Sequence, residues 1–206
     1  MIRHCKALLQ KPLSSGARAG LGIFILGMGI ADWVVRWRNG YYLLPLQLCD
    51  VTLILAAVVW LFPKKRRVGE LVVLWTLSGS VQAVLTPDLS EGFPSPTWFF
   101  FFGTHVCVIW SSLYFLCVED VELSWASVRR ASVWTVLYAA GIMLINGYFR
   151  LNYGYFTAKP DHPSLLDYFG PWPYYVVVEG VLAVVFFSAI LAFGKAIQKK
   201  DLPQRC

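Results

Sequence analysis

The chain has 206 residues, of which 57% are hydrophobic and only 15% are charged. Because soluble domains carry about 25% charged residues, this composition excludes an ordinary water-soluble protein. A net charge of +6 would suit a nucleic-acid binder, but the basic residues stand between apolar runs, where they act as topology signals beside an anionic leaflet. We therefore expect an integral membrane protein whose partner is the lipid bilayer and not a nucleic acid.

Apolar runs long enough to cross a hydrocarbon core about 30 Å thick fill nearly the whole chain. They predict an all-α polytopic bundle of about six transmembrane helices, with residues 1–206 forming a single membrane domain. The first run is too long for a signal peptide and ends in charged residues instead of a small-residue cleavage site, so we interpret it as a retained helix. The predicted spans are 18–37, 42–62, 68–86, 98–118, 130–149 and 173–196.

Lysine and arginine are distributed unevenly between the two sides of this predicted bundle. With six spans, both termini and the loops around residues 64–67 and 119–130 share one side, which holds 14 of the 18 basic residues. Only Arg36, Arg38, Arg150 and Lys159 fall on the other side. The positive-inside rule therefore predicts cytoplasmic N- and C-termini and a multi-pass protein of the inner (plasma) membrane.

Polar and reactive side chains recur at one depth, within about two turns of the predicted outer helix ends. The helical rise places Cys49 and His105 both roughly 10 Å below the boundary, if their spans begin near Tyr42 and Trp98. An ionisable group in lipid costs at least about 2.5 kcal/mol, so it is a functional-site hypothesis by default. These residues predict one outward-facing polar chamber: Asp32, Cys49, Asp50, Gln82, His105, Asn146 and Glu179.

A cysteine and a histidine within hydrogen-bond reach form an activated nucleophile, because the imidazole takes the thiol proton and the thiolate attacks. A carboxylate, either Asp50 or Glu179, is the candidate third group that orients the imidazole. Two amides at the same depth are candidate donors to a developing oxyanion: Gln82 and Asn146.

Structural explanations stand beside these roles. Asp32 can pair with Arg36 one turn later, the two amides can join helices through hydrogen bonds, and a lone intramembrane cysteine is usually packing. The five cysteines show no disulfide framework, no C-x-x-C pair and no zinc spacing. We therefore expect neither a metal nor another cofactor.

Three stretches, residues 44–50, 82–88 and 152–174, carry a more specific pattern. The first contains Pro-Leu-Gln-Leu-Cys, the second is followed by Phe-Pro and His105, and the third contains Lys-Pro, Ser-Leu-Leu-Asp and Gly-Pro-Trp-Pro. Together they resemble the YwaF family of bacterial integral membrane proteins, related to eukaryotic transmembrane protein 164. The resemblance covers about residues 40–180, and the first span and the C-terminal tail add little to it.

The resemblance implies an activity as well as a fold. The eukaryotic relative is described as a phospholipid acyltransferase that depends on an intramembrane cysteine, and is compared with small membrane hydrolases of fatty-acid esters. Carried over by motif, its cysteine corresponds to Cys49 and its histidine to His105. Lys159 is a candidate partner for a phosphate headgroup. The motifs add further candidate substrate contacts: Gln47, Asn152, Tyr153 and Trp172.

The leading hypothesis is a lipid acyl hydrolase or acyltransferase with Cys49 as nucleophile and His105 as base. The main alternative is a non-enzymatic solute-binding or transport protein, because six spans and a pocket rich in Trp and Tyr would also suit the substrate-binding subunit of a vitamin importer. A third is an accessory protein whose polar cluster only joins helices. A covalent acyl adduct on Cys49 would favour the enzyme, and tight binding of an unmodified metabolite would favour the transporter.

Overall fold

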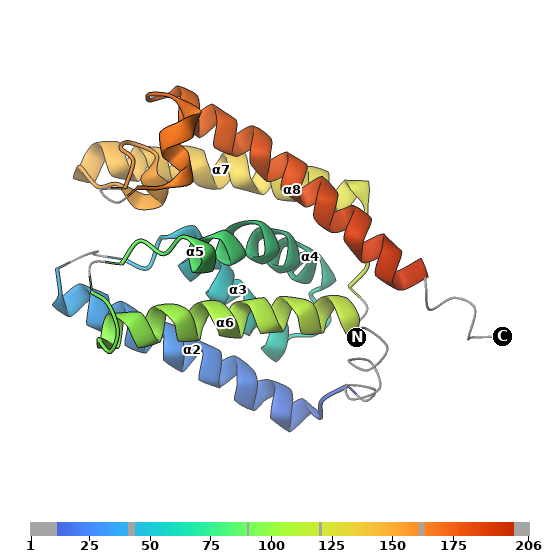
Figure 1. The fold of residues 1–206 in the computed structure, drawn as a ribbon. Helices are drawn as coiled ribbons and strands as arrows, with labels where there is room; N and C mark the ends of the chain where they lie inside the picture. Colours follow the sequence, from blue (N-terminus) through green and yellow to red (C-terminus); the bar gives the residue numbers. More distant parts are fainter. Residues whose placement is uncertain (1–11, 41–43, 90, 120, 161–162, 200–206) are drawn as a thin grey trace.

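A computed structural model describes residues 12–40, 44–89, 91–119, 121–160 and 163–199. The basic residues of the two tails, within 1–11 and 200–206, therefore lie outside the described ranges. Within those ranges all regular secondary structure is helical, which confirms the predicted class. The main helices, shown in Figure 1, are α2 (Ser15–Arg38), α3 (Leu48–Leu61), α4 (Arg66–Trp75), α5 (Val81–Leu85), α6 (Pro96–Cys117), α7 (Trp125–Phe149) and α8 (Tyr174–Lys199).

Helix starts follow local sequence signals. Serine hydroxyls accept free backbone N–H groups at the starts of α2 and α6. The Ser14 hydroxyl accepts the N–H of Ala17, and the Ser95 hydroxyl accepts the N–H of Trp98. Pro96 then occupies the first position of α6, where its missing N–H costs nothing. These caps leave the apolar runs free to form long helices.

Within the described ranges, five helical segments are long and apolar enough to cross a membrane: Ser15–Arg38, Arg66–Leu85, Pro96–Cys117, Trp125–Phe149 and Tyr174–Ala196. The second predicted span is shorter than expected. Its predicted start at residue 42 lies outside the described ranges, but residues 44–47 are described and are not helical, so α3 begins only at Leu48 and has 14 residues. Pro45 lacks the N–H for a helical turn, and the Asp50 carboxylate accepts the N–H of Gln47 at 3.1 Å to start the helix there.

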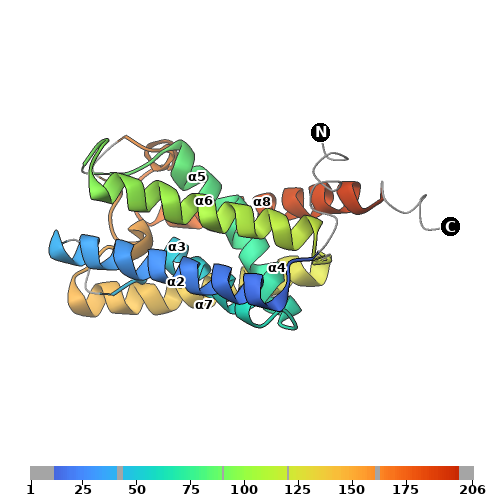
Figure 2. The same ribbon diagram turned by 90° about the horizontal axis from the view of Figure 1, so that it is seen from below.

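The helical segments run back and forth, so the first described helix begins and the last ends at the same end of the bundle (Figures 1 and 2). We call this the basic end, because the Lys64–Arg67 sequence lies there, and the opposite end the cap end, because residues 150–160 and 163–173 cover it. This alternation agrees with an even number of crossings. Which end faces the cytoplasm stays a prediction from the charge distribution.

The core lies between α2, α3, α4 and α6, where Trp60, Leu74 and Phe115 are fully buried. Helices α7 and α8 pack on each other and reach the other helices mainly through α4 and the π-helical segment η1 (Thr76–Ser80) (Figure 1). Their outward faces carry exposed large apolar side chains such as Leu144 and Val177. Such faces are those expected of helices that contact lipid.

The segment 150–173, which we call the cap, is joined to the helices by specific hydrogen bonds. It contains two short 3-10 helices, η2 (Tyr153–Tyr155) and η3 (Leu165–Phe169). The Tyr153 hydroxyl donates to the carbonyl of Leu44 at 2.8 Å, and the N–H of Gly154 donates to Gln47 Oε1 at 3.0 Å. The cap is therefore attached directly to the stretch that precedes α3.

Candidate functional site

A cavity of about 660 Å³ lies at the cap end, which we call the polar cavity. Helices α2, α3, α5, α6 and α8, the segment η1 and the cap all contribute to its wall. Eight of the eleven predicted site residues line it: Gln47, Cys49, Asp50, Gln82, His105, Asn152, Lys159 and Glu179. Residues from four helices and the cap thus meet around one cavity, although the sequence separates them by up to 132 positions.

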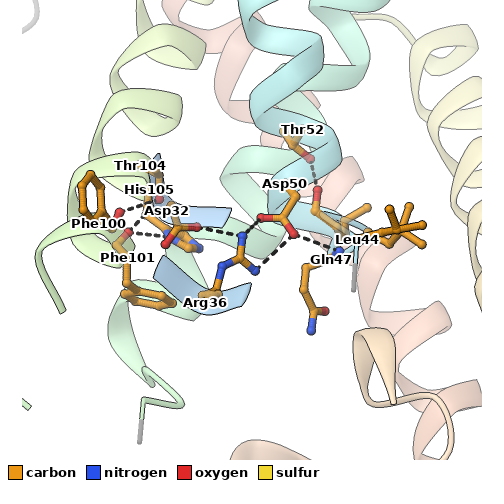
Figure 3. A network of polar contacts seen from close by, with 12 residues as sticks. Asp32, Arg36, Leu44, Gln47, Asp50, Thr52, Phe100, Phe101, Thr104 and His105 are labelled. Carbon is orange, nitrogen blue, oxygen red and sulfur yellow. Dashed lines mark hydrogen bonds and ion pairs between the residues drawn. The ribbon is translucent and has the colours of Figure 1, made fainter. Parts of the chain in front are cut away.

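An arginine shared by two carboxylates forms one wall of the polar cavity (Figure 3). Arg36 Nη2 lies 2.8 Å from Asp32 Oδ2 on the same helix and 2.5 Å from Asp50 Oδ1 on α3. Arg36 Nη1 also donates to the second oxygen of Asp50 at 3.3 Å. The pairing of Asp32 with Arg36 was predicted as the structural alternative, and the bridge to Asp50 extends it across two helices. One positive charge faces two negative charges, which leaves a formal excess of −1 beside the cavity.

His105 stands on α6 and is 5% exposed. Its Nδ1 lies 2.7 Å from the carbonyl oxygen of Phe101, one turn earlier. A carbonyl oxygen only accepts, so Nδ1 carries the proton of the neutral ring and Nε2 carries the lone pair. Nε2 is buried with no hydrogen-bond partner within the described ranges. The group that orients the imidazole is thus a backbone carbonyl, where the sequence had suggested Asp50 or Glu179.

Cys49 is the second residue of α3 and is partly buried. It lines the polar cavity together with His105, but no hydrogen bond joins the two side chains in the described part of the chain. Because no hydrogen bond joins them, the arrangement suits a thiol that loses its proton during attack more than a resting ion pair with His105.

Three predicted contact residues lie outside the lining of the polar cavity. Asn146 is buried near the end of α7, where its side-chain amide donates to the carbonyl of Tyr153 and accepts the Tyr153 N–H, both at 2.9 Å. The Tyr153 ring is buried, and Trp172 Nε1 donates to the carbonyl of Phe156 at 3.0 Å. These side chains stabilise the cap. Asn146 and Tyr153 are tied together by buried hydrogen bonds and Trp172 by an exposed one, and sequence position alone does not reveal these partners.

The remaining polar lining comes from the cap and α8. Both polar atoms of the Asn152 side chain bind groups of the cap. Its amide nitrogen donates to the carbonyl of Ala158 at 2.8 Å, and its amide oxygen accepts the N–H of Thr157 at 3.1 Å. Lys159 Nζ lies 3.9 Å from Asp167, and Glu179 enters from α8 without an ion pair to any described residue. Among the described residues no group of three His, Cys, Asp or Glu side chains is placed to hold a metal ion.

Sequence reasoning missed part of the cavity wall. The segment η1 interrupts the α-helical pattern with a π-helical turn, and it brings Gly79 and Ser80 to the cavity. Single π turns inside α-helices occur frequently at functional sites. The available signal was Gly79 flanked by two serines within an otherwise apolar helix.

A bundle of apolar helices around a polar cavity defines this chain as a polytopic α-helical membrane protein. The sequence matches the model of the TMEM164 family over residues 3–191, so the chain belongs to the TMEM164 family. This match confirms the predicted relation and includes the first helix, which the resemblance had left aside. No curated protein and no solved structure matches the chain significantly.

Proposed function

We propose that the protein is a membrane-embedded lipid acyl hydrolase or acyltransferase in which Cys49 is the nucleophile and His105 the general base. The observation that carries the proposal is the lone pair of His105 Nε2, buried without a partner in the wall that also contains Cys49. Leaving such a group unsatisfied costs about 1–3 kcal/mol. A base with an open acceptor position in the same cavity as a thiol supports proton transfer from an attacking cysteine, directly or through water.

The first half-reaction transfers the acyl group to the protein. Cys49 Sγ attacks the ester carbonyl carbon, and its proton passes to His105 Nε2 directly or through one water in the polar cavity. The tetrahedral intermediate collapses with cleavage of the C–O bond, and the leaving alkoxide takes the proton from His105. The products are an acyl thioester on Cys49 and a free alcohol. Water or a second alcohol then attacks the thioester by the reverse route and restores the thiol.

Neighbouring residues have supporting roles in this scheme. The Gln82 amide lines the polar cavity and is the candidate donor to the developing oxyanion. Asp50 acts as a positioning residue, because its bonds to Arg36 and to the N–H of Gln47 fix the first turn of α3 on which Cys49 stands. Lys159 offers a positive charge for a phosphate headgroup. We further propose that the cap end faces outward across the inner (plasma) membrane, as the distribution of basic residues indicates.

Acyl transfer to the purified protein tests the proposal. Incubation in detergent with p-nitrophenyl acyl esters should add one acyl mass to the protein, located on Cys49 by peptide mass spectrometry. Cys49→Ser should remove this adduct, whereas Cys107→Ser, which changes a partly buried thiol outside the polar cavity, should keep it. His105→Gln should slow acylation by about 10²–10⁴-fold. A protein without an adduct on Cys49, or one acylated equally fast without His105, would contradict the mechanism.

The charged lining of the polar cavity also suits a second function. Arg36, Lys159 and four described carboxylates surround its space, and such groups bind a polar solute as readily as a lipid headgroup. A non-enzymatic solute-binding or transport protein is therefore the alternative proposal. Stoichiometric binding of an unmodified soluble metabolite, blocked by Arg36→Met and unaffected by Cys49→Ser, would favour it over the enzyme.

A further inference from the structure

A second cavity, of about 180 Å³, adjoins Cys49, and we call it the side pocket. Its lining shares six residues with that of the polar cavity, including Cys49, Gly79 and Ser80. Leu48, Thr52 and Trp75 belong to the side pocket and not to the polar cavity. The Cys49 side chain is thus part of the wall between a large charged space and a small uncharged one.

The side pocket presents mainly carbon to its interior, although several lining residues are polar. Thr52 Oγ1 donates to the carbonyl one turn earlier at 2.6 Å, and Trp75 Nε1 donates to a hydroxyl on α7 at 2.9 Å. Gln47 Oε1 accepts the cap N–H of Gly154 at 3.0 Å. None of the described residues that line the side pocket carries a charge, whereas charged side chains such as Asp32 and Arg36 line the polar cavity. Apolar groups therefore partition to the side pocket.

We propose that the side pocket binds the acyl chain of the substrate, and that Trp75 forms its end wall and limits the length of that chain. This inference rests on the proposed function and adds the residue that selects among acyl groups. An ester whose carbonyl carbon lies at Cys49 Sγ would place its chain in the side pocket and its alcohol part in the polar cavity, beside His105. Each part of the ester then meets a surface of its own polarity.

Helix directions place Trp75 at the far end of the side pocket. Thr52 lies three residues beyond Cys49 on α3, about 4.5 Å toward the basic end by the helical rise. Trp75 lies four residues before Gly79, about 6 Å in the same direction. The indole is 4% exposed, its Nε1 is bonded to Thr135 Oγ1, and its ring lies 6.1 Å from that of Tyr138. Contacts with α7 therefore hold the end wall in place.

The volume of the side pocket sets the expected chain length. At about 30 Å³ for each water-sized group, the space holds about six methylene or methyl groups. Each methylene buried up to that length should raise kcat/KM about fourfold, and further methylenes should add nothing or lower it. The protein should therefore prefer esters of about six carbons over both acetyl and palmitoyl esters.

The test is an acyl-chain profile, measured as kcat/KM for p-nitrophenyl esters from two to sixteen carbons. Trp75→Phe and Trp75→Leu should move the optimum to chains longer by about two to four carbons. Trp60→Phe and Trp60→Leu are matched controls, because Trp60 is also buried and also donates to a hydroxyl on another helix, Ser111, at 2.9 Å, but lines neither cavity. The profile of the Trp60 variants should keep the wild-type optimum.

A milder variant covers the case in which Trp75 substitutions do not fold. A Cβ added at Gly79 meets only Leu48 Cδ2 within 4 Å, at 3.8 Å, so Gly79→Ala fits without strain. It should lower kcat/KM for hexanoyl esters about fourfold or more relative to acetyl esters, because one methylene-sized volume is lost. Gly141→Ala on α7, where a Cβ meets nothing within 4 Å, is its control.

The outcomes separate this inference from the proposed function. Wild-type protein that forms no acyl adduct with any ester would refute the enzyme and the acyl pocket with it. Wild-type protein that is acylated, with a profile that neither Trp75→Phe nor Gly79→Ala changes, would refute only the acyl pocket. An equal shift in the Trp60 variants would also refute it, because the shift would then reflect general loosening of the core.

Discussion

The two ends of the bundle each contain an ion-paired arginine, buried for Arg18 and partly buried for Arg36, but their surroundings differ. At the cap end, Arg36 is shared by Asp32 and Asp50 and lines the polar cavity. At the basic end, Arg18 forms an ion pair with Glu119, and its guanidinium carbon lies 5.6 Å from the centre of the Trp60 ring. Arg18 lines neither the polar cavity nor the side pocket.

Packing explains the difference. Trp60 stacks on Trp110 with ring centres 5.6 Å apart and also contacts Tyr114 and Phe115, so aromatic rings fill the space around Arg18. At the cap end, the short α3 and the π-helical η1 leave space that charged side chains surround. A buried charge in a membrane protein therefore indicates a functional site only where a cavity accompanies it.

The largest expected contrast between the two ends is their accessibility to a reagent outside the cell, which should be all or none. Single cysteines placed in 87–97 and 150–172 should react with an impermeant thiol reagent in intact cells, because the basic end is expected to face the cytoplasm. Cysteines in 63–68 should react only after the membrane is permeabilised. Labelling of the Lys64–Arg67 loop from outside would reverse the orientation and the outward-facing cavity.

Removing the two arginines should destabilise the protein to different degrees. Arg36→Met leaves two carboxylates with side chains only 10% exposed, and should lower the free energy of unfolding by about 3–5 kcal/mol. Arg18→Met leaves one carboxylate that is 18% exposed at a helix end, and should cost about 1–3 kcal/mol. Denaturant titration in detergent measures both values. Equal losses would show that the shared arginine is no more strongly coupled than the single pair.

Thiol reactivity should also differ between the ends. A small electrophile should label Cys49, in the wall of the polar cavity, about tenfold faster than Cys117 on the last turn of α6, a difference of about 1.4 kcal/mol in activation free energy. His105→Gln should remove most of this preference because the base is lost, while the protein remains folded in the membrane. Rates that are equal for Cys49, Cys107 and Cys117, and indifferent to His105, would favour the binding protein.

The smallest contrast concerns two tyrosine hydroxyls. The hydroxyl of Tyr155, a cap residue, donates to Asp88 at 2.5 Å, and the Tyr114 hydroxyl accepts the N–H of Leu13 at 3.0 Å at the basic end. Each Tyr→Phe change should cost about 0.5–1.5 kcal/mol in unfolding free energy. Only Tyr155→Phe should raise the labelling rate of Cys49, because only this change loosens the cap. A similar increase in Tyr114→Phe would contradict the separation of the two ends.

Much of the architecture was readable from the sequence for a physical reason. Lipid offers no hydrogen-bond partners, so each apolar run must satisfy its own backbone as a helix, and run length then gives the number of helices. Depth along those helices predicted that Cys49 and His105 lie at one level, and both line the polar cavity. Pro45 and Asp50 carry the signals for the late start of α3, whereas the apolar residues before Leu48 favour a longer span.

Only the tertiary structure decided which side chains meet. Helical spacing reveals the pairing of Asp32 with Arg36, four residues apart, but not that of Arg36 with Asp50, because that contact depends on how α2 and α3 pack. Spacing likewise gave no sign that His105 Nδ1 binds a carbonyl of its own helix, leaving Nε2 free to face a cavity. Helix formation is set within each segment, whereas the cavity, its side pocket and the choice of neighbours come from the fit of side chains between segments.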